Sequence, residues 1–444
     1  MKKTLLICGM IIGILFSIIF YVNEGKQEEI YVAINGNDEN IGSKAEPYRT
    51  LQKASSAASA GTTVYIREGV YKEKLIVQHD GKSSKPIVFK PYSKEKVVLS
   101  GEDAKSEEGD TAVVTIESKS HVTIEGLIIK DLKTKLENET VMGILVTGSS
   151  NDITLKDNLV RQIETHAENG NAHGIAVYGT GPTKNITVIN NILENLKLGF
   201  SEALVLNGNV NGFNISQNIL RHNDNIGIDL IGFEGVASNK TLDFARNGVV
   251  NRNTVHDIST YDNPAYGKEY NAGGIYVDGG RNIRIEENTV HHSDIGIEAT
   301  SEHKGKYAEN IAIVNNHIYE NYFTGISIGG YDEDRGGTRN SLISQNILDQ
   351  NDTKKLGGGQ LLVQHDAELN TIKKNTLTAG ESRIFVANYF LTSDNNKMEQ
   401  NTFHKSKGIK GIWIWRKKNS LHFPISNQRL KVRNRRRTQG FSLQ

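Results

Sequence analysis

The stretch Asn271–Gly305, NAGGIYVDGGRNIRIEENTVHHSDIGIEATSEHKG, decides the fold. It starts with a short Gly-Ile strand, turns at Asp278-Gly-Gly, and enters a second strand in which Ile283 and Ile285 point to one side. A third short strand, TVHH, follows Asn288 and leads into the next Gly-Ile strand, IGIEA. The stretch therefore predicts one complete coil of a repeating β structure.

An asparagine between a β-run and a short apolar pair marks each coil, at intervals of 26 to 35 residues. The positions are Asn158, Asn191, Asn218, Asn253, Asn288, Asn316, Asn346, Asn375 and Asn401. This period, the β-branched strands and only 6 prolines in 444 residues predict a parallel β-solenoid. We expect the asparagine side chains to hydrogen-bond from coil to coil and to occupy the left-handed bend between strands.

The N-terminus carries an apolar segment from Leu5 to about Val22, which predicts a signal peptide or membrane anchor over residues 1–22. We therefore expect export to the extracellular space or the cell envelope, with membrane anchoring through this segment. The single cysteine, Cys8, lies inside it, so the exported part can hold no disulfide.

Residues 23–100 form a distinct opening region with one amphipathic helix expected near Pro47 to Ala60, followed by Gly61. A helix at the end of a solenoid covers the unpaired strand edges and the bare core. We interpret this region as the N-terminal cap and first coils, residues 101–405 as the β-helix proper, and residues 406–444 as a basic, disordered tail.

The run YVAINGNDENIGSKAEPYRTLQKA, followed by GTTVYIREGVYKE and GKSSKPIVFKPY, resembles the opening of secreted right-handed parallel β-helix proteins of the pectin-lyase-like superfamily. The resemblance implies an all-β, single-stranded right-handed parallel β-helix and a carbohydrate substrate. The catalytic strings of family-nine pectate lyases, uronan epimerases and polygalacturonases do not occur in this sequence. The resemblance therefore implies the fold and the substrate class, and leaves the reaction open.

Aligning the Gly-Ile strands places Asp229, Asp278 and Glu298 on the outward side of three successive coils. Strand spacing predicts that the backbones of Asp229 and Glu298 lie about 9.6 Å apart, with Asp278 about 8 Å from each. Carboxyl pairs separated by about 5 to 9.5 Å catalyse glycoside hydrolysis, and mutual repulsion would raise the pKa of at least one. We predict that Asp278 and Glu298 form the catalytic pair, assisted by Asp229.

Aromatic, amide, imidazole and charged side chains near these acids are suited to binding sugar rings and hydroxyl groups. The predicted substrate-binding residues are Tyr178, Asn207, Tyr276, Glu202, His173, Glu302, His303 and Arg335. The predicted function is a polysaccharide-active protein, with glycoside hydrolysis as the favoured reaction.

Two other functions fit the same sequence. In a lyase, calcium at Asp332 and Asp334 would neutralise a uronate carboxylate while Lys304 or Arg335 abstracts the adjacent proton. No cofactor other than calcium is suggested. In a non-catalytic module, the column of polar side chains would bind a cell-surface glycan without turnover.

Charge is distributed unevenly along the chain. Lys405 to Arg437 contains 12 lysines and arginines, whereas the rest of the chain holds 40 basic and 51 acidic residues. Since this tail is the only basic region, we expect no nucleic-acid partner, and the solenoid predicts a monomer that acts on a polysaccharide.

Overall fold

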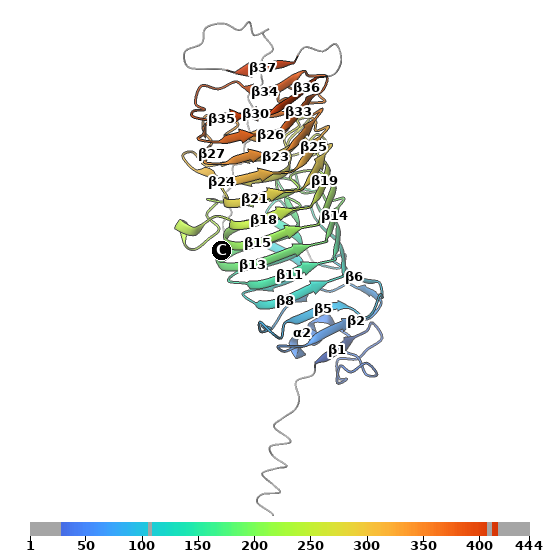
Figure 1. Cartoon of the computed structure of the whole chain (residues 1–444). Helices are drawn as coiled ribbons and strands as arrows, with labels where there is room; N and C mark the ends of the chain where they lie inside the picture. The colour runs from blue at the N-terminus through green and yellow to red at the C-terminus, as the bar shows by residue number, and fades with distance from the viewer. Residues whose placement is uncertain (1–27, 105–108, 406–410, 416–444) are drawn as a thin grey trace, which may run out of the picture.

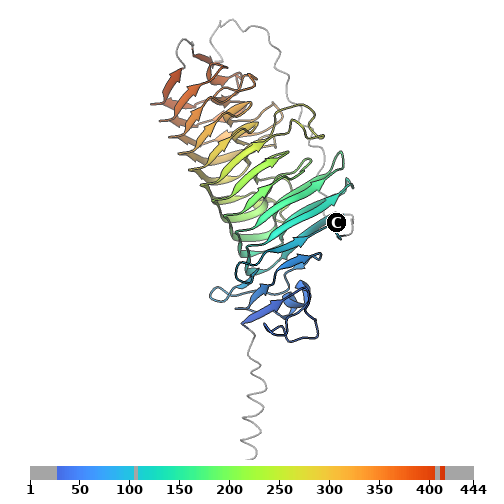
Figure 2. The same cartoon turned by 90° about the vertical axis from the view of Figure 1, so that its right-hand side faces the viewer.

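The computed structural model describes residues 28–104, 109–405 and 411–415. Within these ranges the chain climbs coil by coil through one column of stacked strands (Figure 1, Figure 2). Every pairing between two named strands is parallel, for example Ile275 of one coil opposite Ile297 of the next. The predicted right-handed parallel β-helix is confirmed.

The strands line three faces of the column. The first face contains β4 (Leu75–Ile76), β7 (Gly109–Glu117), β10 (Glu139–Thr147), the first parts of β13 (Asn171–Ile189) and β15 (Leu204–Ser216), β17 (Ile228–Ile231), β20 (Gly273–Asp278), β23 (Ile295–Thr300), β26 (Thr324–Ile328), β30 (Leu361–Val363), β34 (Ile384–Asn388) and β37 (Ile412–Trp415). The second face contains β1 (Glu29–Val32), β2 (Thr63–Ile66), β5 (Ile87–Pro91), β8 (Ser120–Glu125), β11 (Asn151–Lys156), the second parts of β13 and β15, β18 (Arg246–Asn251), β21 (Arg281–Glu286), β24 (Tyr307–Val314), β27 (Gly337–Arg339), β28 (Leu342–Ser344), β31 (Ala367–Glu368), β32 (Thr371–Lys373) and β35 (Lys397–Glu399).

The third face is a separate sheet. It contains β3 (Gly69–Tyr71), β6 (Val97–Ser100), β9 (Ile128–Thr134), β12 (Leu159–Thr165), β14 (Ile192–Glu194), β16 (Ile219–Asn223), β19 (Thr254–Ile258), β22 (Thr289–His291), β25 (His317–Tyr319), β29 (Ile347–Asp349), β33 (Thr376–Ala379) and β36 (Thr402–Lys405). The first two faces join into one sheet because β13 continues around the corner, pairing with β10 and then with β11.

The core fills the interior between the three faces. Alternate residues of each strand point inward, so Ile228 and Leu230 of β17 stack on Ile275 and Val277 of β20, all fully buried. Burying a side chain of this size contributes about 1.5–3 kcal/mol. With no disulfide available to the described residues, stacked apolar columns of this kind supply most of the stability.

The asparagine ladder is confirmed at all nine predicted positions. From Asn158 to Asn401, the Nδ2 of each asparagine donates to the Oδ1 of the next at 2.9–3.0 Å. The prediction that these asparagines adopt the left-handed bend is wrong, because that conformation belongs to the preceding residue, such as Glu287 with φ of 56° before Asn288. The side chain of the ladder residue therefore points inward. There it hydrogen-bonds backbone N–H and C=O groups that have no backbone partner at the corner.

The N-terminal helix, α2 (Leu51–Ala57), is shorter than predicted. It starts after Thr50, whose side chain accepts a hydrogen bond from the Lys53 N–H, and packs against β1 and β4. Pro47 and Gly61 therefore lie outside the helix. A short 3-10 helix, η1 (Lys240–Leu242), stands in a loop at the side of the column (Figure 1).

The C-terminal prediction needs one correction. Strand β37 pairs with β34 and adds one strand to the first face, within the region predicted to be a disordered tail. The remainder of 406–444, and the predicted signal peptide or anchor at 1–22, lie outside the described residues. Among the residues that are described, no helix is long and apolar enough to cross a membrane.

Candidate functional site

The predicted register of the Gly-Ile strands is confirmed on the first face. Asp229 lies opposite Tyr276, and Tyr276 lies opposite Glu298, so the two acids share one column two coils apart. Asp278 lies in the neighbouring column, opposite Ile231 and Thr300. We call the outward side of β17, β20 and β23 the acid face. The strand register from which the spacing was derived is therefore the one observed.

The acid face is not the open surface that the sequence suggested. Asp229, Asp278, Glu298 and Tyr276 all have an exposed fraction of 0%. Asp278 Oδ1 accepts a hydrogen bond of 2.6 Å from the backbone N–H of Glu302, in the loop that follows β23. The alternation along each strand fixed the outward direction correctly, but it carries no information on what lies over the face.

Glu302 is the centre of a polar cluster beside Asp278. Its carboxylate accepts hydrogen bonds from the hydroxyl groups of Tyr276, at 2.9 Å, and Tyr331, and it forms an ion pair of 3.0 Å with Arg335. Burial lowers the pKa of Arg335, but the hydrogen bond with Tyr331 and the charges of Tyr331, Glu302 and Asp332 raise it overall. Arg335 is therefore a fixed cation that positions Glu302.

His303 lies next to this cluster and faces Glu234 from the loop after β17, at 3.3 Å. The hydrogen bond with Glu234 raises the pKa of His303, against the effect of burial. Its ring also approaches Phe233, with 6.5 Å between ring centres. Phe233 has a left-handed φ of 73°, which is unusual for a bulky residue and frequent at functional sites.

The remaining predicted binding residues form a second cluster on β13 and β15 and the loop before β15. His173 Nδ1 donates to the carbonyl oxygen of Glu202 at 3.0 Å, because a carbonyl can only accept. This leaves Nε2 of the neutral ring to accept from the Tyr178 hydroxyl at 2.6 Å. Asn207 pairs with Tyr178 in register, and all four residues are buried. The structure thus brings these four together on the two coils that directly precede Asp229.

Two buried carboxylates hold the long loops that flank the acid face. Asp243 accepts hydrogen bonds from the N–H groups of Gly235 and Ala237, which shapes the loop between β17 and β18. Asp294 accepts from the N–H groups of Thr260 and Asn271 at 2.9 and 2.8 Å, which ties both ends of the loop between β19 and β20. Each carboxylate accepts hydrogen bonds from backbone N–H groups that have no strand partner in these irregular loops.

The predicted metal ligands lie on the loop after β26. Asp332 Oδ1 accepts from the Asp334 N–H at 2.9 Å, and Asp334 faces Lys304 at 3.3 Å. Within 28–104, 109–405 and 411–415, no group of three histidine, cysteine, aspartate or glutamate side chains is arranged to hold a metal ion. Calcium binding therefore remains a prediction.

Sequence reasoning missed Tyr331 and Glu234, which contact predicted residues directly. Both lie in loops that follow strands of the first face, as Glu302 and His303 do. The position in a loop directly after a first-face strand is therefore the sequence signal that could have identified them.

Two family models match the chain. A Pel9A-like right-handed β-helix region matches residues 30–223, and a right-handed β-helix region matches residues 241–429. Uncharacterized protein YwoF of Bacillus subtilis (strain 168) is 52% identical over 418 residues, covering 93% of this chain and 89% of YwoF. The chain belongs to the YwoF family of right-handed β-helix proteins.

Other similarities are partial or confined to the fold. Pectate lyase PEL9 of Emericella nidulans is 35% identical over 77 residues, 17% of this chain and 19% of PEL9. The lacto-N-biosidase GH136 of Eubacterium ramulus shares the fold with a TM-score of 0.57 at 14% identity, over 85% of this chain and 68% of that chain. The A-module of mannuronan C-5 epimerase AlgE4 of Azotobacter vinelandii gives a TM-score of 0.55 at 14% identity, over 86% and 98%. These two solved structures share the right-handed β-helix fold with this chain.

Proposed function

We propose that this protein cleaves a polysaccharide by hydrolysis at the acid face, with Asp278 and Glu298 as the carboxyl pair and Asp229 as a third, positioning acid. The observation that carries the proposal is the strand register, which brings three carboxyl groups from different coils into two adjacent columns. The partial similarity to a pectate lyase and the shared fold with a lacto-N-biosidase support a glycan substrate.

The chemistry follows from the two carboxyl groups. One donates its proton to the glycosidic oxygen as the bond to the anomeric carbon breaks, and the other activates a water molecule or attacks that carbon. Strand spacing separates the backbones of Asp278 and Glu298 by about 8 Å on the diagonal. Carboxyl groups about 6.5 to 9.5 Å apart leave room for water and closer pairs attack directly, so the reach of the two side chains selects between these two routes. Because the acids are fully buried, a glycan reaches them only after the residues over the face move apart.

The test is turnover of neutral and acidic glycans, with separate assays for new reducing ends and for unsaturated uronide products. We expect reducing ends without unsaturation, and their loss in Asp278→Asn and Glu298→Gln. Asp349→Asn, on the third face, is the matched control because it removes a carboxylate of the same type far from the acid face. Full turnover in both acid-face variants on a proven substrate would exclude these residues.

A lyase is the second candidate, favoured by the match to the Pel9A-like model. It needs a base, and Arg335 is a poor one because its raised pKa keeps it protonated. Lys304 is exposed and pairs with Asp334. Unsaturated products that require calcium would establish the lyase. Binding without any product would indicate a glycan-binding module.

A further inference from the structure

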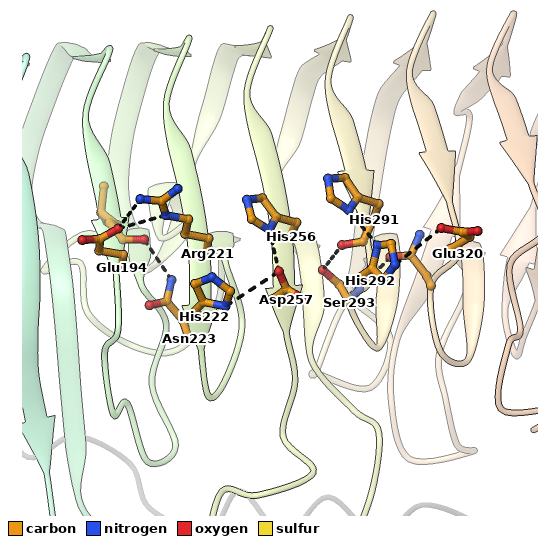
Figure 3. A network of polar contacts seen from close by, with 12 residues as sticks. Glu194, Arg221, His222, Asn223, His256, Asp257, His291, His292, Ser293 and Glu320 are labelled. Carbon is orange, nitrogen blue, oxygen red and sulfur yellow. Dashed lines mark hydrogen bonds and ion pairs between the residues drawn. The ribbon is translucent and has the colours of Figure 1, made fainter.

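A column of planar side chains crosses the third face, away from the acid face. Register places Arg221 of β16 opposite His256 of β19, His256 opposite His291 of β22, and His291 opposite Tyr319 of β25. Figure 3 shows the histidine rings side by side on successive coils, with Asp257 and Glu320 beside them. Nothing in the proposed hydrolysis uses these residues.

The rings of the column are stacked face to face. His256 and His291 have ring centres 4.8 Å apart with an interplanar angle of 4°, and His291 and Tyr319 are 4.7 Å apart at 12°. Parallel packing of this kind is favourable for uncharged rings. Two protonated imidazoles at the same separation would repel each other, because strand spacing prevents them from moving apart.

A second contact also depends on a neutral ring. His291 Nδ1 lies 2.8 Å from His292 Nδ1, with the two rings nearly perpendicular at 85°. One nitrogen must donate a hydrogen and the other must accept it through its lone pair. If both imidazoles are protonated, two N–H groups face each other and the bond is lost.

The neighbouring carboxylates contact the other histidines of this group and not His291. Asp257 Oδ2 lies 2.6 Å from His256 Nδ1 and 3.7 Å from His222 Nδ1, and Glu320 Oε2 lies 3.4 Å from His292 Nε2. Asp257 and Glu320 therefore lie beside the other three histidines of this group, His222, His256 and His292. No carboxylate within ion-pair distance of His291 is found among the described residues.

The surroundings of His291 comprise groups from both adjacent strands. They are His256 and Asp257 from β19, His292 from its own coil, and His317, Tyr319 and Glu320 from β25 and the corner after it. Burial, followed by the charges of His256 and His292, lowers the pKa of His291 to about 4, whereas Asp257 opposes the shift. The lowered pKa of His291 is in the direction expected from the ring stacking and the His291–His292 hydrogen bond, both of which favour a neutral ring.

We propose that the histidine column is an acid-sensitive element of the solenoid, whose coils at β19, β22 and β25 lose local stability as the medium becomes acidic. The sign follows from linkage: a histidine whose folded-state pKa is depressed binds fewer protons in the folded than in the unfolded chain. Its stabilising contribution is therefore complete above about pH 6.5 and declines as the pH falls toward 4. This holds whether or not the acid face is catalytic.

The test is amide hydrogen exchange followed by mass spectrometry at pH 7 and pH 4.5, corrected for the intrinsic exchange rate. In the wild type, protection of β19 and β22 should fall by about tenfold more than that of β9 and β12, which lie on the same face without histidine. His291→Gln keeps a planar polar group that does not titrate, and should remove most of this extra loss. His121→Gln is the matched control, because His121 belongs to β8 on the second face.

A second measurement does not depend on a variant. Titration of the wild-type protein with carbon-13 label in the imidazole rings should include a histidine that stays neutral to below pH 5, assigned to His291 by its absence from His291→Gln. A titration of His291 near the ordinary histidine value would overturn the proposal. Equal acid-induced loss of protection in the wild type and His291→Gln would also overturn it.

Discussion

Replacing Asn288 by alanine tests whether the asparagine ladder stabilises the solenoid as the contacts indicate. Asn288 is buried, and its Nδ2 donates to the carbonyl oxygen of Val250 and to Oδ1 of Asn316, both at 2.9 Å. Its Oδ1 accepts from the backbone N–H and the Nδ2 of Asn253, also at 2.9 Å. Alanine removes all four hydrogen bonds and leaves the partner groups buried.

The expected loss of unfolding free energy follows from the four hydrogen bonds removed. A hydrogen bond within a protein contributes about 1 kcal/mol net, so the free energy of unfolding should fall by about 4 kcal/mol. Unfolding entropy scales with chain length at about 2.1 cal/mol/K per residue. For a chain of 444 residues, this loss corresponds to a melting temperature lower by about 4 °C.

The assay is equilibrium urea unfolding followed by far-ultraviolet circular dichroism, together with a thermal melt. Asn211→Ala is the matched control, since Asn211 accepts only one solvent-exposed bond, of 2.7 Å from Asn247. Its unfolding free energy should change by less than about 0.5 kcal/mol. If Asn288→Ala were as stable as Asn211→Ala, the ladder would be a consequence of the coil geometry and not a source of stability.

Three further predictions rest on the contacts around the loops. Glu302→Gln should weaken the ion pair with Arg335 and reduce turnover of a proven substrate at least tenfold with little change in melting temperature, measured by steady-state kinetics and calorimetry. Asp294→Ala should expose the loop between β19 and β20 to limited proteolysis, because it loses the N–H partners of Thr260 and Asn271. Burial raises the pKa of Asp352 to about 7 from 3.8, so the wild type should lose stability relative to Asp352→Asn as the pH rises from about 4 to 7, which thermal melts across that range would measure.

The fold and the register of the first face could be read from the sequence because both depend on patterns that repeat within each coil. Side-chain alternation sets which residues point outward, and the asparagine at each corner fixes how one coil is aligned with the next. Asp229, Tyr276 and Glu298 therefore fall in one column, as predicted. Eight of the nine ladder asparagines, all except Asn401, are buried, and their side chains satisfy backbone groups at the corners of the coils.

Other features depended on contacts between distant segments. The burial of Asp278 and the cluster around Glu302 join Tyr276 of strand β20 with Tyr331 and Arg335 from a loop of another coil, and no local pattern relates them. The stack of His256 and His291 was equally hidden, since residues 35 apart meet only after the coils close. The sequence by itself determined the repeat, the strand faces and the alignment of the acids, because these follow from the geometry of a single coil. Only the tertiary structure decided which loop covers, pairs or stacks on which coil, because that depends on the packing of side chains that share no period.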